Sequence, residues 1–81
     1  MSEVKGTITS IDTDDENNRQ IATVLSHSRL DSGERALVGR FLLIPGTNAM
    51  PGLKVKAKTE DRAGNVLRDV ATHLVLGYKL P

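Results

Sequence analysis

Turn-forming residues interrupt this sequence about every ten residues, a spacing typical of small all-β domains. They cluster at 12–18, 31–34, 45–52 and 62–65, and the runs between them are rich in β-branched and other apolar side chains. The chain has 81 residues, which provide one thin hydrophobic core and no more. We therefore predict that residues 1–81 form a single all-β domain.

The fourth and fifth runs predict a hairpin. Residues 53–60 alternate strictly, with lysines on one face: Lys54, Lys56 and Lys58. We expect this run to pair with a single strand over 66–76 in a register that places Lys58 opposite Asp69. This register sets apolar residues against one another and turns Arg68 to the face opposite the lysines.

Two segments admit a helical alternative. Asp31 followed by Glu34 resembles a capping box for a short helix over 34–41, although two glycines disfavour it. Residues 66–74 also fit a helical stripe, but their β-branched content favours a strand. We therefore predict an all-β fold with at most one short helix or turn of helix, a small five-stranded antiparallel barrel of the OB or SH3 type.

Composition excludes several classes of function. Cysteine is absent, which rules out disulfides, thiolate metal sites and thiol catalysis. Eleven basic and ten acidic residues balance to a net charge of +1, so the chain as a whole has no electrostatic signature of a nucleic-acid or membrane partner. No run approaches the roughly 20 apolar residues of a membrane span. The first six residues lack the features of a secretion signal. We predict a cytoplasmic location and no membrane partner.

The acidic turn over 12–18 matches a calcium-binding loop only at its first ligand positions. Asp12, Asp14 and Glu16 alternate as the first ligands of a calcium loop do. Asn17 and Thr23, however, occupy the positions that require glycine and a bidentate glutamate. A solvated turn is the better interpretation.

The residue types of a nucleophilic triad occur in Ser26, His27, Ser28 and Asp31. Neighbours on a strand point to opposite faces, so these serines do not reach the histidine between them. The second histidine, His73, is distant in sequence and is explained as a cross-strand neighbour of Lys54. We predict no catalytic residues, no metal site and no cofactor, and hence a protein that is not an enzyme.

The third run, 35–44, begins at Arg35 and is apolar on both faces from residue 36 onward apart from Arg40. Such a run must be covered on both sides, either inside a closed barrel or by another subunit. The leading functional hypothesis is therefore a non-enzymatic β-barrel interaction module that forms a homo-oligomer. Its predicted interface consists of Leu37, Val38, Phe41, Leu42, Leu43 and Ile44.

The lysine row supports an alternative function, in which a barrel binds nucleic acid through phosphate contacts. The candidate residues are Lys54, Lys56, Lys58 and Arg62. Against this hypothesis, the hairpin contains no aromatic residue on which a base would stack, and lysines on a strand also serve to prevent edge-to-edge pairing. A further alternative is a small-ligand pocket in a barrel mouth lined by the loop over 45–52.

Overall fold

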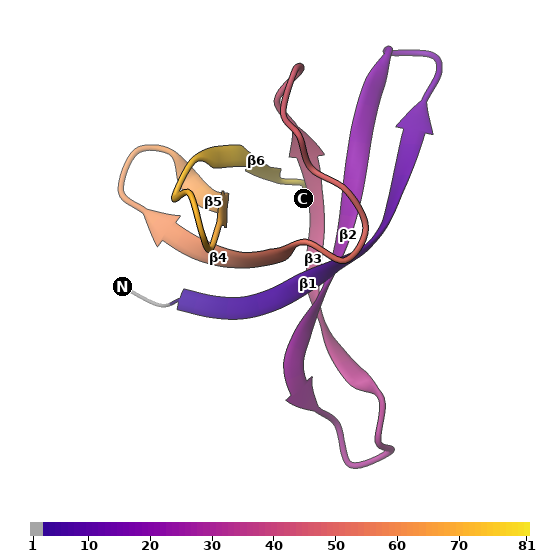
Figure 1. The fold of residues 1–81 in the computed structure, drawn as a ribbon, viewed down its shortest axis with the longest axis vertical. Coiled ribbons are helices and arrows are strands. Elements are labelled where there is room, and N and C mark those ends of the chain that lie inside the picture. Colours follow the sequence, from indigo (N-terminus) through magenta and orange to yellow (C-terminus); the bar gives the residue numbers. More distant parts are fainter. Residues whose placement is uncertain (1–2) are drawn as a thin grey trace.

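The computed structural model describes residues 3–81, which form six strands and no helix (Figure 1). The strands are β1 (Glu3–Asp14), β2 (Arg19–Arg29), β3 (Arg35–Leu43), β4 (Lys54–Glu60), β5 (Gly64–Asp69) and β6 (Val75–Lys79). They close into a barrel in the order β1-β2-β3-β6-β5-β4, and every neighbouring pair is antiparallel. The predicted all-β antiparallel barrel is confirmed, with six strands in place of five.

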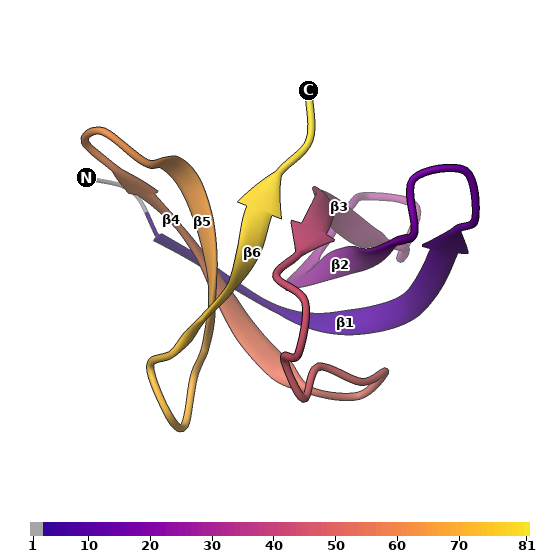
Figure 2. The ribbon, with the colours of Figure 1, turned by 90° about the horizontal axis from the view of Figure 1, so that it is seen from above.

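The barrel consists of two three-stranded meanders joined by the segment 44–53. Seen from above, β1, β2 and β3 form one side and β4, β5 and β6 the other (Figure 2). The β1–β4 and β3–β6 pairings close the barrel. Gly6 permits β1 to pair with both β2 and β4, because a Cβ at this position would collide with the carbonyl oxygen of Leu25.

The sixth strand arises from a break in the run predicted as one strand over 66–76, and that prediction was wrong. The carboxylate of Asp69 accepts hydrogen bonds from the amides of Ala71 and Thr72 at 2.7 and 3.3 Å. His73 adopts a left-handed backbone conformation (φ 63°), and its amide donates to the carbonyl of Asp69 at 2.9 Å. These interactions form a tight turn that returns the chain as β6.

The predicted β4–β5 register was also wrong, by three residues. Gly64 lies opposite Glu60 with φ 72°, so three residues make the loop. A left-handed glycine after a short turn is the usual way to close such a loop. Lys56 consequently lies opposite Arg68, and Arg68 shares the outward face of the lysines, contrary to the prediction.

The core fills the barrel interior with side chains from every strand. The buried cluster comprises Ile8, Ala22, Val24, Phe41, Leu43, Val55, Leu67 and Leu76. The short helix considered for 34–41 does not form, because β3 pairs with β2 along one edge and with β6 along the other. With no helix among residues 3–81, the described chain contains none that could cross a membrane.

Candidate functional site

The lysines of β4 lie on the outer surface of the barrel. Val55 is fully buried in the core, and alternation along the strand directs the side chains of its neighbours outward. Lys54 is exposed, while Lys56 and Lys58 are half-buried. Alternate residues on a strand are roughly 7 Å apart, so the three ammonium groups follow one line.

The β1–β4 pairing adds a lysine that sequence reasoning missed. Lys5 lies directly opposite Lys56 and is exposed. β1 and β4 are far apart in the sequence, so the alternation within either strand could not reveal that Lys5 lies beside Lys56. We call Lys5, Lys54, Lys56 and Lys58 the basic face. Arg62 is exposed in the loop that follows β4.

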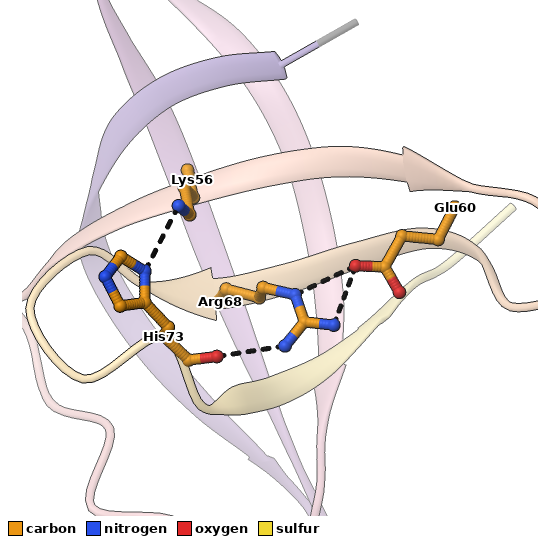
Figure 3. A network of polar contacts seen from close by, with 4 residues as sticks. All are labelled: Lys56, Glu60, Arg68 and His73. Carbon is orange, nitrogen blue, oxygen red and sulfur yellow. Dashed lines mark hydrogen bonds and ion pairs between the residues drawn. The ribbon is translucent and has the colours of Figure 1, made fainter. Parts of the chain in front are cut away.

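Arg68 shares this outer surface, but its charge is compensated. Its Nε donates to Glu60 Oε1 at 2.9 Å, and its Nη2 forms an ion pair with the same oxygen at 2.7 Å (Figure 3). Its Nη1 donates to the main-chain carbonyl of His73 at 2.9 Å. The guanidinium therefore links the β4–β5 hairpin to the turn before β6. Val66 lies between Gly64 and Arg68 on the same outward side and is only 1% exposed, which indicates that this ion pair covers it.

His73 also contacts the basic face. Lys56 Nζ donates to His73 Nδ1 at 3.3 Å (Figure 3), since a lysine ammonium has no acceptor. The sequence predicted Lys54 as the neighbour of His73; the corrected turn gives it Lys56 instead.

The Ser26–His27 pair has no catalytic geometry. Ser26 points into the barrel, is 7% exposed, and its Oγ accepts a hydrogen bond from the Ser28 amide at 3.0 Å. His27 is exposed and contacts Thr7 Oγ1 through Nε2 at 3.2 Å. The alternation of faces expected from the sequence therefore separates the serine from the histidine.

Tyr78 is the second residue that sequence reasoning missed. It lies opposite Val66 on β5 and Leu42 on β3, on the outward side, and is 44% exposed. Val66 in turn lies opposite Lys58. An aromatic ring thus lies two strands from the basic face, a position hidden by the unrecognised break at Asp69. The available signal was the turn-forming Asp69 and Thr72 between two β-prone segments.

The acidic turn lies at the far end of β1 from Lys5, in a hairpin that projects beyond the barrel (Figure 1). The carboxylate of Asp14 accepts hydrogen bonds from Asn17 Nδ2 at 2.9 Å and Arg19 Nη2 at 3.0 Å. These two contacts, that of Asn17 first, lower the pKa of Asp14 below its ordinary value. Within residues 3–81, no group of three or more potential ligands is arranged to hold a metal ion.

The six predicted interface residues divide between the inside and the outside of the barrel. Phe41 and Leu43 belong to the core, and Val38 packs against it. Outward lie Leu42 and Ile44, both half-buried, and Leu37, which is 64% exposed. Closure of the barrel thus accounts for the apolar character of one face of β3.

Two hollows adjoin these elements. A groove of about 440 Å³ is bordered by the end of β3 and the β1–β2 hairpin, with Leu42, Ile44 and Pro45 as its apolar members. A second hollow of about 280 Å³ lies between the loop 45–48 and the turn after Asp69. The predicted mouth loop therefore does line a cavity, together with Thr72, Leu74 and Leu76.

No family model, curated protein or solved structure shows a significant match to this chain.

Proposed function

We propose that this barrel is a non-enzymatic binding module whose basic face contacts the phosphates of a nucleic acid. The observation that carries the proposal is the convergence of four lysines from β1 and β4 on one outer surface. Phosphate contacts supply most of the affinity of sequence-independent nucleic-acid binding. Lysine is well suited to them because its ammonium group is a compact charge on a flexible stem.

The distribution of carboxylates supports this proposal. Four of the ten lie in the acidic turn at the opposite end of β1: Asp12, Asp14, Asp15 and Glu16. Near the basic face, Glu60 is engaged by Arg68, and Asp69 accepts hydrogen bonds from the amides of the turn that follows it. Glu3 lies opposite Lys58, and Asp61 precedes Arg62 in the loop after β4. The net charge of +1 therefore conceals a local excess of positive charge over β4. At physiological salt this field acts over roughly 8 Å, so the local balance matters more than the total.

Fluorescence anisotropy with a labelled oligonucleotide at several salt concentrations tests the proposal. Four phosphate contacts predict a slope of log K against log salt of about −3 on a single strand. The double substitution Lys54→Glu with Lys58→Glu should weaken binding and reduce the magnitude of that slope by about 1.4.

The matched control combines Arg19→Glu with Arg29→Glu, at the two ends of β2, which changes the net charge equally away from the basic face. Both control residues are exposed. If the two double variants lose affinity to the same extent, binding depends on overall charge and the proposed face is wrong. If the wild-type protein binds no oligonucleotide at low salt, the proposed function itself fails.

Self-association is a second candidate, favoured by the outward half of the predicted interface. Leu37 is 64% exposed, and Leu42 and Ile44 border the groove of about 440 Å³. Sedimentation equilibrium tests it: a dimer should dissociate when Leu37 and Ile44 are both changed to serine. A wild-type protein that stays monomeric at high micromolar concentration would contradict this candidate.

A further inference from the structure

Tyr78 is an exposed aromatic ring with apolar neighbours on both sides of its strand. Val66 and Leu42 lie directly opposite it on β5 and β3 and share its outward side. Val66 is 1% exposed and Leu42 is half-buried, whereas Tyr78 is 44% exposed. The ring is therefore the accessible member of a small apolar group, Val66, Tyr78 and Leu42, which we call the shelf.

Cationic side chains flank this shelf on both sides. Lys58 lies opposite Val66, one strand beyond the shelf, at the edge of the basic face. Arg40 is exposed and lies two residues before Leu42 on the same outward side of β3. Neighbouring strands are about 4.8 Å apart, so Lys58 and Tyr78 are separated by roughly 10 Å across β4, β5 and β6. Positive charge thus lies close to the one exposed ring.

We infer that the nucleic acid bound by this barrel is single-stranded, and that one of its bases stacks on Tyr78 while neighbouring phosphates contact Lys58 and the basic face. This inference rests on the proposed function and specifies its ligand. Positive charge together with an exposed aromatic ring is the combination that sequence-independent single-strand binders use. A duplex keeps its base faces stacked inside, so it has no face to offer to Tyr78.

The composition of the chain makes this inference directly measurable. Tyr78 is the only tyrosine, and tryptophan is absent, so tyrosine emission comes from this residue alone. A base stacked on the ring should quench it. The experiment measures the intensity of Tyr78 emission during titration at low salt, corrected for absorption by the bases with free N-acetyltyrosinamide as the reference. Three probes of equal length are compared: a single-stranded oligonucleotide, an abasic oligonucleotide and a duplex.

The expected result is a reduced corrected emission with the single strand and an unchanged emission with the abasic strand and the duplex. Tyr78→Leu, which keeps an apolar residue on the shelf, should weaken single-strand binding roughly 5- to 150-fold. It should leave the affinity for the abasic strand unchanged. Tyr78→Phe should retain the wild-type affinity, because its ring still stacks.

The contrary outcomes separate the stacking inference from the proposed function. Binding of all three probes with equal affinity and an unchanged corrected emission would overturn the stacking inference and leave phosphate contact by the basic face intact. Tight binding of the duplex with no loss in Tyr78→Leu would have the same consequence. Failure of every probe to bind would overturn the proposed function and this inference together. If Tyr78→Leu does not fold, the wild-type emission with the three probes still decides the question.

Discussion

Across the β4–β5 hairpin, on the outer side of the barrel, Arg68 Nε donates a hydrogen bond to Glu60 Oε1 at 2.9 Å, and Arg68 Nη2 forms an ion pair with the same oxygen at 2.7 Å. The same guanidinium donates a hydrogen bond to the carbonyl oxygen of His73. We predict that Arg68→Met lowers the free energy of unfolding by about 1–2 kcal/mol, because Glu60 loses its partner and the turn before β6 loses an anchor. Thermal unfolding should show a decrease in Tm of several degrees. Arg62→Met, in an exposed loop, is the control and should have no measurable effect.

Gly64 closes the three-residue loop between β4 and β5 with a left-handed backbone. A Cβ added at this position would have no atom within 4 Å, so a substitution here tests backbone strain alone. Gly64→Ala should destabilise the barrel by about 1 kcal/mol, measured by urea unfolding. Gly64→Asn should cost less, since asparagine tolerates this conformation. Equal stability of Gly64→Ala and the wild type would contradict the assigned loop geometry.

At Gly77 the requirement for glycine is steric rather than conformational. A Cβ there would collide with the carbonyl oxygen of Leu42 and lie 2.9 Å from its carbonyl carbon, where β3 and β6 pair to close the barrel. We expect Gly77→Ala to cost about 1–3 kcal/mol or more, because backbone cannot move aside as a side chain can. In parallel urea titrations it should be less stable than Gly64→Ala. The reverse order would show that the β3–β6 approach is looser than described.

Asp14 makes a small contribution to the pH dependence of stability. Hydrogen bonds from Asn17 and Arg19 favour its charged form and lower its pKa from the ordinary value of 3.8. A carboxyl with a lowered folded-state pKa stabilises the protein above the unfolded-state value, and that stabilisation is lost as pH falls through the folded-state value. NMR titration of the side-chain carboxyl carbon should give a pKa below 3.8. In Arg19→Leu this pKa should rise, and an unchanged pKa would show that Arg19 does not contribute.

Features with a local cause were predictable from the sequence. The alternation over 53–60 indicates which side of β4 carries the lysines, because side-chain direction follows directly from strand period. The β4–β5 register was not predictable in this way, because it depends on the left-handed conformation of Gly64. The break at Asp69 depends on side-chain hydrogen bonds to the amides of Ala71 and Thr72.

The candidate site was less predictable than the fold because it is assembled by long-range pairings. Lys5 reaches the basic face through the β1–β4 pairing, and Tyr78 lies near Lys58 only because β6 pairs with β5. Neither pairing leaves a local pattern in the sequence. The interface prediction treated both faces of β3 alike, and only closure of the barrel distinguishes Phe41, which is buried, from Leu37, which is exposed.

The arrangement of two meanders closed by the β1–β4 and β3–β6 pairings has a consequence for biosynthesis. When β3 has been translated, the strands that will cover Ile8, Val24 and Phe41 have not yet been made. At about 5–20 residues per second, synthesis of the second meander takes on the order of a few seconds. During that time the nascent first half exposes apolar side chains and two unpaired strand edges. The risk of aggregation during synthesis is therefore set by the time until β6 is made rather than by the stability of the finished barrel.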